Sequence, residues 1–182
     1  MNRNGKGCRW IYVMPILYVV SAYLVLAIPF LKIPTFLPEI LFGMLLLFGS
    51  MNLVVVLTVG SMATRVQILN CARIVKYGLI PFFVIGAGLV VLSFLLIFIP
   101  VPITIFMAPA LAFTLCVVGW FILVLGAPYS IAYIVRAFKE RVNSGVLSVF
   151  AGIFQFFFVM DVIFVIILAC KDRIYRRLSG LS

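Results

Sequence analysis

Hydrophobic residues gather along this chain into five long runs, separated by short polar or proline-containing stretches. Each run has 22 to 25 residues, and about 20 apolar residues are enough to span the hydrocarbon layer of a membrane as a helix. A backbone in lipid must satisfy its own hydrogen bonds, which favours helices. We therefore predict an all-α integral membrane bundle of five transmembrane helices, formed as a single domain by residues 1–182. The predicted helices lie at about 10–31, 40–63, 77–99, 103–125 with an extension to 138, and 146–170.

The stretch 64–76 is the longest polar region between two runs. Its apolar and polar residues do not separate cleanly at the period of an α-helix, and a helix lying along the membrane surface is one interpretation of this stretch. The other breaks contain proline, which ends or starts helices. They lie at Pro34 and Pro38, at Pro100 and Pro102, and at Pro128.

The composition agrees with a membrane protein, since 66% of the residues are hydrophobic and 10% are charged. Soluble domains contain about 25% charged residues. The 14 lysines and arginines exceed the 4 acidic residues, but they cluster at the ends of the runs, as the positive-inside rule describes. We therefore expect contacts with the lipid bilayer and its anionic headgroups, and no nucleic-acid binding.

The distribution of basic residues predicts a multi-pass protein of the cell membrane with a cytoplasmic N-terminus. Five crossings place nine lysines and arginines inside and five outside, the five being Lys32 and four in the C-terminal tail. A re-entrant last segment would instead place thirteen inside and one outside. Because 25 residues is also the natural length of one crossing, we expect five crossings, with the re-entrant segment as the alternative.

Asp161 is an acidic residue inside the last apolar run. A charge in hydrocarbon is costly, so such a residue is protonated, paired or turned toward the bundle interior. Three interpretations follow: a hydrogen-bonded residue that joins two helices, a proton or cation site, or a contact waiting for a partner subunit. The same question applies to the other polar residues in or beside the runs: Asn52, Lys76, Tyr129, Ser130 and Gln155. For Lys76 we expect the ammonium group to reach the interface.

Small residues predict close helix packing at two places. Ser144, Ser148 and Gly152 are spaced four residues apart, and Ala108 and Ala112 have the same spacing. Such positions let a neighbouring backbone approach. We expect them to pack helices within the bundle, against a membrane partner subunit or in a homo-oligomer.

Catalytic chemistry has little support in the sequence. There is no histidine, and the four cysteines are scattered without a CxxC pair. Asp161 has no second carboxylate within the runs, as an aspartyl dyad needs. We therefore expect no enzyme activity, no catalytic residues, no metal and no cofactor.

Two stretches carry a resemblance, residues 73–87 (RIVKYGLIPFFVIGA) and residues 127–171. They resemble a family of small, uncharacterised multi-pass membrane proteins of gut Clostridia. In that family a Lys-x-x-x-Ile-Pro segment opens a middle helix, and the last helix contains Gln-Phe-x-Phe-x-x-Asp-Val-Ile. The resemblance implies a membrane fold and draws attention to Lys76, Tyr129, Ser130, Gln155 and Asp161. It implies no activity, because the family has none assigned.

Two hypotheses for the function follow. The first is a non-enzymatic accessory or structural membrane component. The second is a small transporter or channel that uses Asp161 as an intramembrane proton or cation site.

Overall fold

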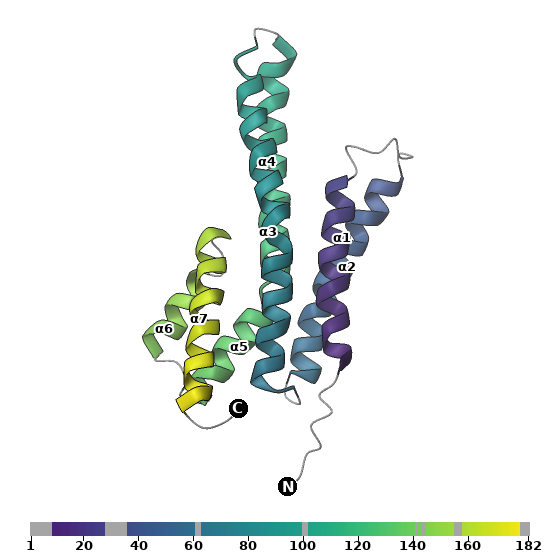
Figure 1. The fold of residues 1–182 in the computed structure, drawn as a ribbon. Helices are drawn as coiled ribbons and strands as arrows, with labels where there is room; N and C mark the ends of the chain where they lie inside the picture. Colours follow the sequence, from purple (N-terminus) through teal and green to yellow (C-terminus); the bar gives the residue numbers. More distant parts are fainter. Residues whose placement is uncertain are drawn as a thin grey trace.

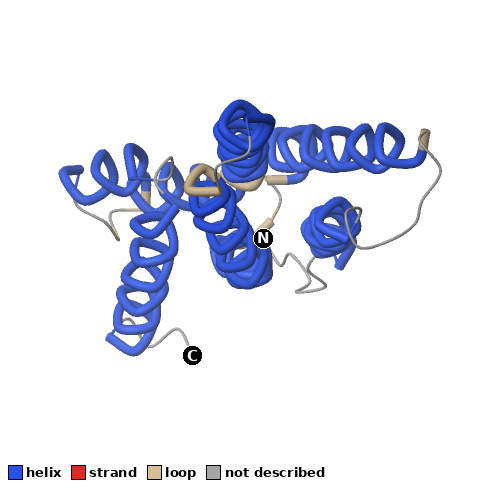
Figure 2. Tube along the Cα trace, turned by 90° about the horizontal axis from the view of Figure 1, so that it is seen from above, coloured by secondary structure: helices blue, strands red, loops and turns tan. Residues whose placement is uncertain are grey.

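The computed structural model describes residues 9–27, 36–60, 63–99, 102–140, 142, 145–154 and 158–178. Over these residues the chain forms helices and the turns that join them, without any strand (Figure 2). The all-α prediction is therefore confirmed for the described part of the chain. The α-helices vary in length from 10 to 32 residues, and the positions of their ends decide where polar side chains meet.

The first helices form a pair. A 3₁₀ turn, η1 (Arg9–Tyr12), leads into α1 (Val13–Ala27), and α2 (Leu37–Val59) returns beside it (Figure 1). Pro38 stands at the start of α2, where its missing N–H removes no hydrogen bond and its fixed φ suits a helix.

The two longest helices stand at the centre of the molecule. They are α3 (Arg65–Leu96) and α4 (Pro102–Leu125), which lie between the α1–α2 pair and the α6–α7 pair (Figure 1). The sequence predicts a third helix that begins near residue 77, and this boundary is wrong. The helix begins at Arg65, because Thr64 and Gln67 form a capping box that starts a helix in the polar stretch.

The C-terminal part contains three shorter helices. These are α5 (Pro128–Lys139), α6 (Gly145–Phe154) and α7 (Phe158–Leu178). The last apolar run, expected as one helix over 146–170, is divided between α6 and α7, which lie side by side and end well below the top of α3 (Figure 1). The two described ends of the chain, Arg9 and Leu178, lie at the same end of the molecule (Figure 1).

Three helices of the described residues are long and apolar enough to cross a membrane: Leu37–Val59, Arg65–Leu96 and Ile103–Leu125. Val13–Ala27 is apolar but shorter. Large hydrophobic side chains such as Leu57 and Phe106 are exposed on their outer faces, as expected of surfaces that meet lipid. The prediction of five spans is therefore supported only for three of them.

The core lies around the first half of α3, where α1 and α5 pack against it. The hydroxyl of Tyr23 donates to the carbonyl of Gly78 at 2.7 Å. A Cβ on Gly78 would lie 2.9 Å from the side chain of Val19, so only glycine permits this distance between α1 and α3. The long helix α3 is thus held at the end where the charged residues lie.

Candidate functional site: a charged network at one end of the bundle

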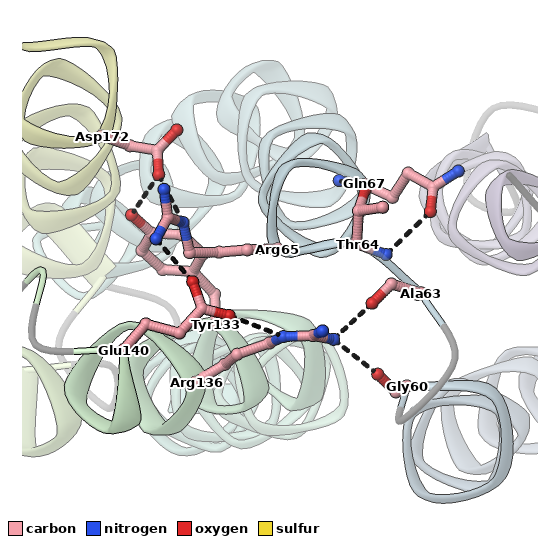
Figure 3. A network of polar contacts seen from close by, with 9 residues as sticks. All are labelled: Gly60, Ala63, Thr64, Arg65, Gln67, Tyr133, Arg136, Glu140 and Asp172. Carbon is pink, nitrogen blue, oxygen red and sulfur yellow. Dashed lines mark hydrogen bonds and ion pairs between the residues drawn. The ribbon is translucent and has the colours of Figure 1, made fainter. Parts of the chain in front are cut away.

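A network of charged side chains joins α3, α5 and α7 (Figure 3). Arg65 stands at the start of α3, and its Nε lies 2.8 Å from Oδ1 of Asp172 in α7. Its Nη1 lies 2.6 Å from Oε2 of Glu140, just after α5. The guanidinium also lies 5.2 Å from the ring centroid of Tyr175, within the range of a cation–π contact. One side chain therefore connects three helices that are far apart in the sequence.

The two acidic partners of Arg65 differ in their surroundings. The side chain of Asp172 is fully buried, whereas that of Glu140 is 41% exposed. A buried carboxylate without a positive partner costs several kcal/mol, while an exposed pair contributes about 1 kcal/mol or less. The contact between Arg65 and Asp172 is therefore the one on which the network depends.

Arg136 in α5 forms the second half of the network. Its Nε donates to Oε1 of Glu140 at 3.1 Å, so Glu140 bridges two arginines. Its Nη1 donates to the carbonyls of Gly60, at 3.1 Å, and Ala63 (Figure 3). Carbonyls at the end of a helix have no partner within the helix. Arg136 satisfies one such carbonyl at Gly60 and a second carbonyl at Ala63 in the turn, and so ties α5 to the turn between α2 and α3.

The start of α3 is fixed by short-range hydrogen bonds beside this network. The backbone N–H of Thr64 donates to the side chain of Gln67 at 2.9 Å, and the N–H of Gln67 donates back to the Thr64 hydroxyl at 3.3 Å. This reciprocal pair orients the first turn of α3. Arg65 belongs to that turn, so the cap also determines where its guanidinium lies.

Tyr133 of α5 contributes a neutral donor to the network. Its hydroxyl lies 3.4 Å from the carbonyl of Leu168 and 3.5 Å from Oδ1 of Asp172. Burial raises the pKa of Tyr133, and the neighbouring Asp172 carboxylate raises it further. The phenol therefore keeps its proton and donates toward α7.

Several residues predicted from the sequence lie in the interior, away from this network. Asn52 in α2 and both Tyr129 and Ser130 in the first turn of α5 are buried. Their side-chain nitrogen and oxygen atoms make no hydrogen bond within the described part of the chain. Unpaired buried polar groups are uncommon and costly, so these three positions are of functional interest.

Lys76 is also inside the bundle. The sequence predicts an ammonium group that reaches the interface, but the residue lies on the packed face of α3 with 4% of its surface exposed. The spacing along the helix explains this position. Lys76 follows Arg65 by eleven residues, which is close to three full turns, so the two share one face of α3.

The backbone of Asp161 belongs to α7, whereas its side chain lies outside the described part of the structure. Eleven residues separate Asp161 from Asp172, the same interval that separates Arg65 from Lys76. The helices α3 and α7 also flank a shared depression lined by Tyr77 and Ile166. Because α3 and α7 run in opposite directions (Figure 1), the contact between Arg65 and Asp172 sets a register that brings the backbone at position 161 near the level of Lys76.

The remaining predicted positions concern helix packing. Ala108 and Ala112 are buried on α4, and Ser148 and Gly152 are half-buried on α6. Ser144 and Gln155 lie outside the described residues.

Sequence reasoning missed the acidic members of the network. Asp172 stands among the basic residues of the tail and Glu140 among those after α5, so each looks like part of a solvated charged stretch. For Asp172 the signal that could have found it is spacing, because Asp161 and Asp172 repeat the interval between Arg65 and Lys76.

A comparison with protein-family models gives a match over residues 40–174, to a family of unknown function (DUF6652). The chain belongs to this family. The DUF6652 region contains every charged member of the network, from Arg65 to Asp172, and it begins after α1. Searches of curated proteins and of solved structures give no significant match. The expectation of an uncharacterised family is therefore confirmed, while its restriction to gut Clostridia stays a prediction.

Proposed function

We propose that this protein is a multi-pass integral membrane protein with a non-enzymatic role, as an accessory or structural membrane component. The observation that supports this most directly is the clamp in which Arg65 lies between Asp172 and Glu140. Together with Arg136, which also pairs with Glu140, the clamp contains two cations and two carboxylates that neutralise one another and connect helices, as in a packing element. Exposed apolar faces on α2, α3 and α4 suit contact with lipid, with a partner subunit or with a second copy.

In the proposed topology, helices α1 to α4 cross the membrane, α5 continues from the end of α4 to the cytoplasmic surface, and α6 and α7 form a re-entrant hairpin. The turn η1 and α1 together provide 19 residues, Arg9 to Ala27, about 28 Å at the rise of an α-helix. The clamp supports the re-entrant hairpin, because a segment that enters and leaves on one face must be held by protein. All of the 14 lysines and arginines except Lys32 would then lie on the cytoplasmic side.

A small transporter or channel is the second candidate. The observation in its favour is the set of buried side chains without hydrogen-bond partners within the described chain, Asn52, Tyr129 and Ser130. Such groups can line a polar path through a bundle. The register of α3 and α7 argues against Asp161 as an isolated proton carrier, because it brings a cation, Lys76, to the level of position 161.

A reporter of sidedness fused after Ser182 tests the topology in intact cells. We expect a cytoplasmic signal there and an external signal from a reporter inserted beside Lys32. A second cytoplasmic signal is expected from an insertion between α5 and α6. An external signal after Ser182 would mean that the last segment crosses the membrane once, which would overturn the re-entrant hairpin.

Flux measurements in proteoliposomes separate the two candidate functions. The structural role predicts no proton or cation flux above that of empty liposomes, and no effect of Asp161→Asn on flux. A flux that depends on pH and disappears in Asp161→Asn, with Ser148→Ala as a control on α6, would establish the transporter instead.

A further inference from the structure

A groove of about 800 Å³ runs between α2 and α5, with the end of α4 beneath it. This volume lies within the range of sites that bind small molecules. On the α2 side its wall is one helical face, with residues three, four or seven positions apart. The residues that form this wall are Gly49, Ser50, Leu53, Val56 and Leu57 of α2, and Gly60 directly after it.

The opposite wall is formed by α5, and its character changes along the groove. Ile131, Ala132 and Val135 present apolar surface, whereas Arg136 and Lys139 line the groove toward the end of α5. Arg136 donates to the carbonyl of Gly60, which places this basic end beside the last turn of α2. The groove is therefore apolar for most of its length and positively charged at one end.

The length of the groove can be estimated from its α2 wall. Eleven residues separate Gly49 from Gly60, about 16 Å along the helix axis. This is roughly half of the ~30 Å hydrocarbon thickness of a bilayer. The groove therefore matches the depth of one leaflet, with its basic end at the cytoplasmic surface in the proposed topology.

The charges at the basic end leave a net attraction for an anion. Arg136 shares the carboxylate of Glu140 with Arg65, and Arg65 also meets Asp172. Lys139 is exposed and forms no ion pair with the described residues. Among these described side chains, three cations face two carboxylates, and Lys139 is the cation to which no described carboxylate is paired.

We propose that this groove binds one acyl chain of an anionic phospholipid, with its phosphate at Lys139 and Arg136. The proposal rests on the membrane topology proposed above. An apolar channel one leaflet deep fits an acyl chain, and a basic mouth at headgroup level fits a phosphate. Ala132 lines the groove, and its small side chain leaves room there for the acyl chain.

Native mass spectrometry of the full-length protein in detergent tests this, with phosphatidylglycerol and phosphatidylcholine of identical acyl chains as probes. We expect phosphatidylglycerol to bind about fivefold more tightly, because one lysine near an anionic headgroup contributes an attraction of that order. Lys139→Gln should abolish the preference. Ala132→Leu should weaken both lipids by filling the groove.

Matched controls keep the result interpretable. Arg173→Gln removes one exposed charge on α7, away from the groove, and Ala110→Leu enlarges an exposed side chain of α4. Both should bind lipid as the unchanged protein does, and melting temperatures should show that all variants fold. Equal affinity for the two lipids, or equal losses from Lys139→Gln and Arg173→Gln, would overturn the proposal.

Light scattering distinguishes lipid from a second copy of the chain as the occupant. If Ala132→Leu converts an oligomer to a monomer and leaves lipid affinity unchanged, the groove is a protein interface and the proposal is wrong. The lipid-binding measurement and the topology measurement give separate results, so a failure of one can be told from a failure of the other. If the reporter after Ser182 is cytoplasmic but the protein shows no preference between the two lipids, only the groove proposal is rejected. If carbonate releases the protein from membranes, the proposed function is rejected as well.

Discussion

Arg65 and Asp172 meet although they lie far apart in the sequence, with 2.8 Å between Nε and Oδ1. Arg65 opens the longest helix, α3, and Asp172 belongs to the last helix, α7. The carboxylate is fully buried and the arginine side chain is 10% exposed. This contact fixes how far α7 can slide along α3, and several properties of the molecule follow from it.

Removing either partner should destabilise the fold strongly. Arg65→Gln leaves the carboxylate of Asp172 buried without its cation, at a cost of about 3–5 kcal/mol. Asp172→Asn leaves a less buried arginine that keeps Glu140, so we expect a smaller loss. Thermal unfolding in detergent, followed by circular dichroism, would measure both.

The double variant Arg65→Gln/Asp172→Asn provides the decisive comparison. Because it removes both charges together, its loss of unfolding free energy should be smaller than the sum of the losses in the two single variants. Arg173→Gln, which removes an exposed charge on α7, is the control and should change little. Strictly additive losses would show that the pair does not couple α3 to α7.

Glu140 and Arg136 should differ in importance although they form an ion pair. Glu140 is 41% exposed, so Glu140→Gln should cost about 1 kcal/mol or less. Arg136→Gln also removes hydrogen bonds to the carbonyls of Gly60 and Ala63, so its cost should exceed that of Glu140→Gln. Limited proteolysis of the turn between α2 and α3 would report the loss, and equal cleavage of the two variants would contradict this prediction.

The apolar runs predict helices because a spanning length of apolar residues leaves few other structures. The beginning of α3 cannot be predicted in the same way. The stretch 64–76 lacks a clean helical period, and its helix depends on the cap at Thr64 together with burial of residues such as Cys71 and Val75 against other helices. Tertiary packing, which one sequence does not display, decides the outcome.

The division of the last run into α6 and α7 is equally hard to predict. Residues 146–170 are almost entirely apolar and long enough for one helix, so length alone favours a single crossing. The balance of basic residues indicates the alternative, in which both ends lie on one side.

The site residues differ in how visible they are in the sequence. Polar residues in apolar surroundings are easily recognised, as at Asn52, Tyr129 and Ser130. The acidic residues Glu140 and Asp172 stand among basic residues and give no such contrast.

The cap of α3 should make a measurable contribution of its own. Thr64→Ala removes the hydroxyl that accepts from the N–H of Gln67, and losing such a cap costs about 1 kcal/mol. Thr58→Ala is a matched control, because that hydroxyl donates to the carbonyl of Val54 within its own helix. Comparable melting temperatures for the two variants would show that the cap does not hold the start of α3.

The register of α3 and α7 yields a last prediction, for Lys76 and Asp161. On α7, Val165, Leu168 and Asp172 are buried, and position 161 precedes them on the same helical face. On α3, Lys76 is buried on the face that carries Arg65. A lysine and an aspartate at one level on neighbouring helices attract each other.

Single and double substitutions test this pairing. Lys76→Met and Asp161→Asn should each lower the melting temperature, because each leaves one charge in the interior, whereas the double variant should recover part of the loss. Lys171→Met, which replaces a half-exposed lysine on α7, serves as the control for Lys76→Met. If Asp161→Asn has the same effect in the Lys76→Met variant as in the unchanged protein, the two side chains do not interact, and the carboxylate becomes available for the proton or cation site of the alternative function.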